Sequence, residues 1–451
     1  MKINFITGII IVFLLVLYVE AEPALPAGLG VDDENIAKGP EKKRGIELPF
    51  KLYGFWDTRT GLRLQPDDHQ GDWILLEDRI QLGADKFGQL IGFKVVADIL
   101  IDYTDSAETH VDLNTGEGWF DLRQANIVIT PVSAVDMKIG RQILTWGTGD
   151  LLFINDNFPK DWQSFFCGRD VEYLKSPSDA VKGSFFTDFV NIDLVYTPQF
   201  DPDRYITGNR ISYYNSGLKR PAGESDEMLF DIPNEWFDDD ELAARLYRNV
   251  NGCEVALYGY NGFWKSPGGQ NMEGAAIFPR LNVWGASVRS PIAGGIGNAE
   301  AGYYDSRDDS SGTDPMIKNS EWRALVGYEH DLKSIASDFT IALQYYLEIM
   351  DDYSGYRDFL PNNIPVRDEC RHVLTLRLTK MVLRQNLQLS FFSYYSPSDK
   401  DAYLRPYAGY KINDRWKVDA GANLFIGEDD YTFFGQFEKN NNIYMGVRYS
   451  F

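Results

Sequence analysis

The chain has 451 residues, of which 44 are lysine or arginine and 66 are aspartate or glutamate, so its formal net charge is −22. This balance argues against a nucleic-acid partner, because phosphate binding needs clustered basic side chains. Three cysteines are too few for a disulfide framework, and their spacing matches no zinc or haem motif. We therefore interpret Cys167, Cys253 and Cys370 as packing or incidental thiols.

The N-terminus has the pattern of a signal peptide. Lys2 precedes an apolar run that ends at Val19-Glu20-Ala21, where small or apolar residues occupy the two positions that a signal peptidase recognises. We predict a signal peptide over 1–21, with a retained anchor helix as the alternative. Residues 22–51 are expected to form a polar periplasmic tail or a short hatch in the lumen. No later apolar stretch is long enough for a spanning helix, and the mean hydropathy is negative, which excludes a helical membrane protein.

From residue 52 onward, apolar and polar side chains alternate in segments of about ten residues, as in the strands of a membrane barrel. In 338–350, the odd-numbered positions from Phe339 to Ile349 are all apolar, whereas Thr340, Gln344 and Glu348 lie on the other face. One face suits lipid and the other suits water. The expected strands are 52–64, 72–84, 90–102, 118–130, 135–146, 168–176, 183–197, 242–250, 253–264, 280–290, 297–307, 320–331, 338–350, 371–382, 385–396, 403–412, 415–426 and 442–451.

Short and long connections alternate between these segments. Asn251-Gly252 is a type I′ hairpin signal, and the longest loops are expected at 147–167, 198–241 and 351–370. This parity predicts an all-β protein in which 52–451 form a transmembrane antiparallel β-barrel of about 18 strands, or 16, with both termini periplasmic. A closed sheet satisfies every backbone group in lipid, so we expect the chain in the outer membrane of a Gram-negative bacterium.

The last strand carries the most specific signal. Val447, Tyr449 and Phe451 continue an apolar row that ends on a terminal aromatic residue. This pattern resembles the C-terminal signal that outer-membrane barrels present to their assembly machinery, which pairs with such a strand at its edge. We therefore expect the assembly machinery and outer-membrane lipid as partners, whereas the sequence does not indicate the oligomeric state.

The inward face of the predicted strands is mixed in charge and slightly basic. Rings of basic side chains favour anions in a narrow pore, although mixed rows also pair with one another across strands. The basic residues expected to line the lumen are Arg59, Arg79, Lys94, Lys138, Arg323, Arg377 and Arg448.

One motif narrows the family. Ile139-Gly140-Arg141-Gln142 is followed by Trp146-Gly147-Thr148-Gly149-Asp150 and then by 156–161, which read DNFPKD. These roughly thirty residues resemble a pattern in the alginate-export-type porins and their uncharacterised relatives, although Phe158 interrupts the Asn-Pro pair. The motif opens the third outer loop, which in porins commonly folds inward. The expected pore or constriction residues are Arg141, Gln142, Asp150, Asp156 and Asp161.

Arg141 interrupts the apolar row of its strand, which suggests a bulge that turns it into the lumen. It would then either contact the solute or tie the loop to the wall through Asp150 or Asp156. Both alternatives follow from the cost of placing an arginine against lipid, about 2 to 4 kcal/mol at mid-membrane.

Catalysis is not expected, because no serine or cysteine motif accompanies His69, His110, His330 and His372. We expect no cofactor and no metal, although the acidic loop 305–314 offers oxygen ligands for calcium as an alternative. The sequence thus predicts an outer-membrane channel for passive diffusion or export of small or oligomeric, anionic solutes, either small molecules or oligosaccharides. The alternative is a non-conducting surface barrel whose long acidic loops bind a partner.

Overall fold

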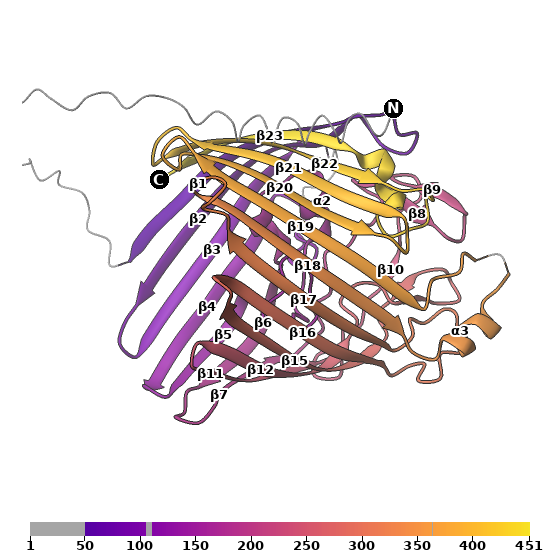
Figure 1. The fold of residues 1–451 in the computed structure, drawn as a ribbon, viewed down its shortest axis with the longest axis horizontal. Helices are drawn as coiled ribbons and strands as arrows, with labels where there is room; N and C mark the ends of the chain where they lie inside the picture. Colours follow the sequence, from indigo (N-terminus) through magenta and orange to yellow (C-terminus); the bar gives the residue numbers. More distant parts are fainter. Residues whose placement is uncertain (1–49, 105–110, 363) are drawn as a thin grey trace, which may run out of the picture.

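The computed structural model describes residues 50–104, 111–362 and 364–451. The predicted signal peptide and residues 22–49 of the predicted tail or hatch lie outside the described residues. An antiparallel sheet of 18 strands runs through the chain, and the first strand pairs with the last, from Phe55 opposite Ser450 to Arg63 opposite Asn442. The sheet is therefore a closed barrel, as predicted (Figure 1).

The barrel strands, in chain order, are β1 (Lys51–Arg63), β2 (Trp73–Phe87), β3 (Ile91–Asp102), β4 (Phe120–Val132), β5 (Val135–Ile143), β6 (Pro177–Phe185), β7 (Asn191–Thr197), β11 (Glu241–Val250), β12 (Cys253–Phe263), β15 (Arg280–Ile292), β16 (Gly295–Ser306), β17 (Glu321–Asp331), β18 (Phe339–Met350), β19 (Cys370–Val382), β20 (Leu387–Ser396), β21 (Asp401–Lys411), β22 (Trp416–Ile426) and β23 (Asn442–Ser450).

Short turns join the strands at one end of the barrel and long loops join them at the other, at the left and right of Figure 1. The turn between β11 and β12 has positive φ at both central residues, 54° at Asn251 and 85° at Gly252, as a type I′ turn requires. β1 begins and β23 ends at the short-turn end. We call the part of the lumen on this side the inner part and the part at the long-loop end the outer part.

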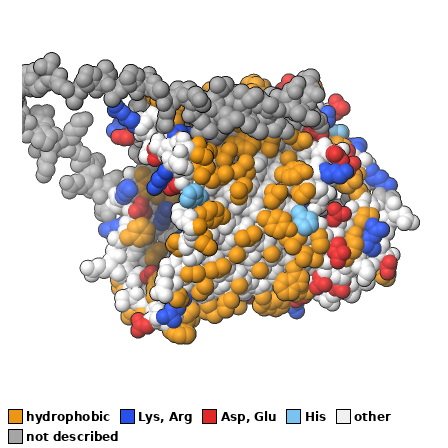
Figure 2. Space-filling view, in the orientation of Figure 1, with side chains coloured by type: hydrophobic (Ala, Val, Ile, Leu, Met, Phe, Trp, Pro, Cys, Tyr) orange, Lys and Arg blue, Asp and Glu red, His pale blue; other side chains and the backbone are white. Residues whose placement is uncertain are grey.

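Side chains alternate between the two faces of the wall. On β18, Leu343 is exposed on the outside whereas Gln344 and Tyr346 are buried inside the barrel. Figure 2 shows hydrophobic side chains over the middle of the barrel and charged ones gathered toward its two ends. This distribution is the apolar band that a bilayer requires. The outward row of β23 includes Val447 and Tyr449, in the predicted assembly signal.

One predicted strand is wrong. Residues 168–176 contain the short 3-10 helix η1 (Val171–Leu174), and the sixth strand is β6, which starts at Pro177. The predicted strand 183–197 is accordingly split by a turn between β6 and β7. Val171 and Tyr173 alternate with polar residues as they would in a strand. Tyr173 is nevertheless buried inside the lumen, where its hydroxyl donates to Asp98.

The loops at the long-loop end carry additional elements. Among the described residues, no helix has the length and apolar character of a membrane span. The helix α3 (Tyr353–Phe359) follows β18, and the 3-10 helix η2 (Gly435–Asn440) follows β22. A small core of Phe200, Phe263 and Phe278 packs beneath the loop between β7 and β11. The additional elements are α2 (Trp162–Cys167), α3 (Tyr353–Phe359), η2 (Gly435–Asn440), β8 (Tyr213–Asn215), β9 (Arg220–Ala222), β10 (Phe230–Asp231), β13 (Gly269–Gln270) and β14 (Ala276–Ile277).

Candidate pore constriction and solute cavity

The third long loop, residues 144–176, crosses the lumen between β5 and β6. We call it the partition loop. It contains α2 and η1, and its apolar side chains Ile154, Phe158, Phe165 and Phe166 are buried in a core inside the barrel. Burial of these apolar side chains stabilises the loop inside the lumen. The partition loop therefore separates the outer part of the lumen from the inner part.

The tip of the partition loop is fixed to the opposite wall by Glu300 of β16. Its carboxylate accepts hydrogen bonds from the backbone N–H groups of Thr148 and Gly149, the latter at 2.7 Å, and from Nδ2 of Asn155 at 3.1 Å. Charge-assisted bonds of this kind are roughly twice as strong as neutral ones. Arg377 of β19 adds an ion pair to Asp150. The tip is thus held at two places on the far wall.

The second half of the partition loop is fixed to the wall of β1, β22 and β23. Nη1 of Arg59 donates to the carbonyl oxygen of Gly168 at 3.3 Å, and Asp170 lies within 4 Å of Arg59, Lys417 and Arg448. Burial alone would raise the pKa of Asp170, but Arg448, Lys417 and Arg59 hold that pKa below its usual range. This half of the loop is therefore locked by charges that remain ionised at neutral pH.

A buried carboxylate joins the partition loop to the next long loop. Asp203 accepts the backbone N–H of Lys160 at 2.7 Å, Nε1 of Trp162 at 3.0 Å and Oγ of Ser266. Burial raises the pKa of Asp203, and these donors partly offset the increase. The partition loop is therefore fixed from above as well as from the barrel wall.

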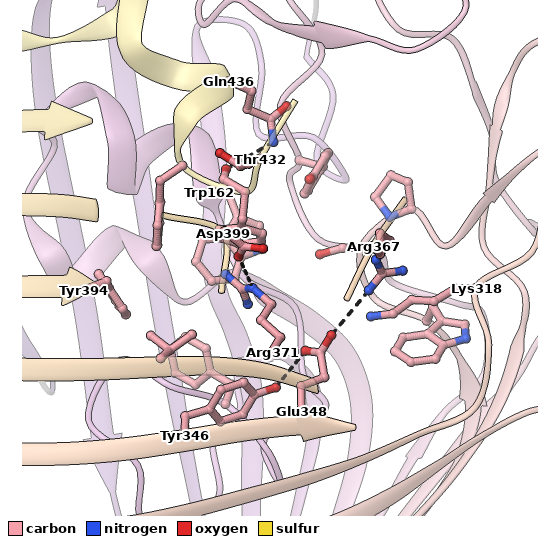
Figure 3. A pocket seen from close by; sticks show the side chains of 18 of the residues that line it. Trp162, Lys318, Tyr346, Glu348, Arg367, Arg371, Tyr394, Asp399, Thr432 and Gln436 are labelled. Carbon is pink, nitrogen blue, oxygen red and sulfur yellow. Dashed lines mark hydrogen bonds and ion pairs between the residues drawn. The ribbon is translucent and has the colours of Figure 1, made fainter. Parts of the chain in front are cut away.

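Above the partition loop lies a cavity of about 720 Å³, which we call the outer cavity. Its floor includes Trp162 and Phe165, and Tyr346 and Tyr394 come from the barrel strands around it. Figure 3 shows Trp162 and Tyr394 on one side of the cavity and Lys318 and Arg367 on the other. A cavity of this size that combines aromatic rings with a few polar groups is typical of a small-molecule site.

Each lysine and arginine that lines the outer cavity lies beside a carboxylate. Glu348 illustrates this: Arg367 donates to it at 3.3 Å and the hydroxyl of Tyr346 at 3.0 Å, as the dashed lines in Figure 3 show. The remaining pairs are Lys160–Asp156, Lys265–Glu241, Lys318–Glu321, Arg323–Glu321, Arg371–Asp399 and Lys400–Glu428. The cavity thus contains many charges but little net positive charge.

The inner part of the lumen differs. Lys138 of β5 stands opposite Lys182 of β6, and Lys94 of β3 is close enough to repel it. Lys182 pairs with Asp193 at 3.4 Å, whereas Lys138 has no carboxylate partner among the residues that the structure describes. Asp85 stands opposite Lys94, but its carboxylate is hydrogen-bonded to Tyr53. We call Lys94, Lys138 and Lys182 the lysine row.

Arg141 does not line an open pore. Its buried guanidinium donates to the carbonyl oxygens of Leu122 and Leu113 and pairs with Asp179 at 2.6 Å. Leu122 lies beyond the last β4–β5 pair, so Arg141 fills the gap where these strands separate. The β5–β6 register is continuous through Arg141, and the β4–β5 ladder reaches Arg141 without a register shift beside it, so no bulge stands at the expected position. The expected ties to Asp150 or Asp156 are replaced by the pair with Asp179.

The other expected constriction residues occupy different places. Gln142 is fully buried and donates to the carbonyl oxygen of Ala180 at 2.9 Å. Asp161 caps α2 by accepting from the N–H and the hydroxyl of Ser164. Asp150 reaches the opposite wall, and Asp156 lines the outer cavity. Their effect on solute passage stays a prediction.

Most of the predicted lumen residues hold the partition loop. Arg59 and Arg448 bind its second half, Arg377 binds its tip, and the guanidinium carbon of Arg79 lies 4.2 Å from the ring centroid of Tyr173. Arg323 lines the outer cavity. Lys94 and Lys138 belong to the lysine row, so two of the predicted residues face the inner lumen without holding the loop.

Sequence reasoning missed Glu300, Gln344 and Lys182 as site residues. Alternation along β16 and β18 indicates that Glu300 and Gln344 face inward, but it does not indicate that they accept backbone N–H groups of the partition loop. Lys182 was missed because the sixth strand was placed too early. Among the described residues, no group of three or more histidine, cysteine or acidic side chains is arranged to hold a metal.

No family model matches the chain, and no curated protein matches it. Among solved structures, it is similar to OccD3 (OpdP) of Pseudomonas aeruginosa, with a TM-score of 0.52, 12% identity and coverage of 89% of this chain and 91% of that one. The chain is also similar to OccAB3 of Acinetobacter baumannii, with a TM-score of 0.51, 11% identity and coverage of 89% of this chain and 99% of that one. A third similar structure is OccK2 (OpdF) of Pseudomonas aeruginosa, solved in complex with glucuronate. Its TM-score is 0.51 and its identity 12%, with coverage of 89% of this chain and 98% of that one.

These barrels are outer-membrane porins, and at such low identity the likeness concerns the fold. It supports the predicted porin-type barrel, whereas the resemblance of the motif to the alginate-export-type porins stays a prediction. The apolar band on the outside of the wall is independent support for a membrane location. The chain is therefore a closed 18-stranded outer-membrane β-barrel with the fold of the porins.

Proposed function

We propose that the chain is a passive channel through which small solutes cross the outer membrane, with a preference for anions that is set in its inner part. The lysine row carries this proposal. A lysine that faces water between two other lysines is stabilised by a bound anion, and basic rows in a narrow pore raise the local concentration of anions.

Planar-bilayer recording of the folded barrel tests the proposal. We expect discrete conductance steps and, across a potassium chloride gradient, a reversal potential on the chloride side of zero. A folded barrel that inserts but carries no current would support the alternative, a surface barrel whose acidic loop between β7 and β11 binds a partner. A reversal potential on the potassium side would keep the channel and refute its anion preference.

A further inference from the structure

The outer cavity has a chemistry that the lysine row does not share. Its cations are already paired, so an anionic solute would have to displace a carboxylate to reach them. Lys318, for example, lies beside Glu321 at 3.1 Å. Exchange of one buried ion pair for another brings little net free energy. Anion capture is therefore a poor description of the outer cavity.

Aromatic rings supply an apolar surface around the same space. Trp162 rises from the partition loop, and Tyr431 and Phe433 stand at the mouth, in the loop between β22 and β23. The last two rings are each 43% exposed, so a solute can reach them. Arg371 lies over the ring of Phe433, at 4.7 Å from its centroid. Rings arranged in this way favour a solute with a flat apolar face.

The polar edges of the cavity offer donors and acceptors together. Asp399 accepts from Arg371 at 2.6 Å and from Ser396, and carboxylate oxygens have further acceptor capacity. Arg367 uses one N–H on Glu348 and its side chain is about half exposed, so it has further N–H groups for a solute. A hydroxyl group both donates and accepts, whereas a carboxylate only accepts. Paired edges of this kind therefore match hydroxyl groups better than they match charged groups.

We propose that the outer cavity binds an uncharged, hydroxyl-rich ring compound, a saccharide of one or two rings, before it crosses the partition loop. The aromatic rings pack against the apolar face of the sugar, and the paired charges bind its hydroxyl groups. The volume lies within the range of about 300 to 1,000 Å³ for small-molecule sites. The inference rests on the proposed function in that the sugar would enter a conducting channel. A neutral sugar passes the lysine row without an electrostatic cost.

The test is the block of single-channel current by three solutes added on the long-loop side: maltose, sorbitol and sodium glucuronate. Sorbitol has hydroxyl groups but no ring, and glucuronate has a ring and a carboxylate. We expect maltose to interrupt the current at lower concentration than either of the others. Equal block by all three, or stronger block by glucuronate, would overturn the proposal.

The double substitution Tyr431→Ala with Phe433→Ala should raise the half-blocking concentration of maltose by about tenfold, since both exposed rings are lost. Phe359→Ala is the matched control, because Phe359 is an exposed ring at the same end that does not line the cavity. An unchanged half-blocking concentration in the double variant would contradict the proposal. If the folded barrel carries no current, the proposed function fails, and calorimetric titration of maltose into the barrel decides the sugar site separately.

Discussion

The outer cavity and the inner wall of the lumen differ in how their basic side chains are neutralised. In the outer cavity, seven lysine and arginine side chains lie beside carboxylates. On the inner wall, Lys138 lies between two lysines. Inward-facing charge is therefore a poor guide to selectivity unless its partners are known.

The partition loop keeps the two parts separate, and Glu300→Ala should break that separation. The substitution removes the acceptor for the N–H groups of Thr148 and Gly149 and leaves them unsatisfied inside the lumen. We expect a several-fold rise in single-channel conductance with increased current noise. Glu300→Gln keeps one acceptor oxygen, so its single-channel conductance should lie between those of Glu300→Ala and the wild type. Wild-type conductance in Glu300→Ala would show that the apolar contacts hold the tip without it.

Asp150→Asn should make the inner part more basic. Asp150 neutralises Arg377, and it does not line the outer cavity. Loss of its charge leaves Arg377 as an additional free cation, so the reversal potential should move further toward chloride. The measurement is the reversal potential in a potassium chloride gradient, and block by maltose should stay at its wild-type concentration. A shift toward potassium would mean that Arg377 does not face the ion path.

Asp201, in the outer part, should have a smaller effect, on the stability of the barrel and its dependence on pH. Burial, reinforced by Glu241, raises the pKa of Asp201 to about 6. Because the folded pKa lies above the unfolded value near 3.9, the ionised carboxylate destabilises the fold above pH 6, and this cost disappears as the pH falls toward 4. Asp201→Asn should therefore stabilise the barrel by at most about 3 kcal/mol at pH 7 and by nothing at pH 4.

Heat-modifiability on gels at the two pH values measures this difference in stability. The wild type should become more stable as the pH falls from 6 to 4, whereas the stability of Asp201→Asn should not change over that interval. Parallel curves for the two proteins would show that Asp201 remains hydrated when it is ionised. The lysine row should be unaffected, since Asp201 lies in the loop between β7 and β11.

Much of the barrel could be predicted from the sequence, because alternation with period two, turn signals and loop parity are local features. The turn at Asn251 and the apolar row of β18 are examples. The error at 168–176 arose because Val171 and Tyr173 alternate like a strand while their segment is held inside the lumen. Alternation cannot distinguish a strand in the wall from an extended segment that packs against it.

The candidate site was less accessible to prediction for a physical reason. Alternation indicates that Glu300 and Arg377 face inward, but their partners belong to a loop more than a hundred residues earlier in the chain. The resemblance of the motif drew attention to the partition loop, and that loop does cross the lumen. Within the motif, Arg141 closes a gap in the wall, because it donates to the carbonyl oxygen of Leu122 beyond the last β4–β5 pair.

The central claim is that ion selectivity arises at the lysine row, in which Lys138 has no carboxylate partner among the described residues, and not at the paired cations of the outer cavity. It is tested most directly by comparing Lys138→Gln with Arg367→Gln, since each removes one positive charge, the first from the inner wall and the second from the outer cavity, where Arg367 pairs with Glu348. The reversal potential should move clearly toward potassium in Lys138→Gln. It should stay close to the wild-type value in Arg367→Gln, because Glu348 then still accepts from Tyr346 and remains close to Lys318, Arg323 and Arg371. An equal shift in both variants, or a larger one in Arg367→Gln, would contradict the account.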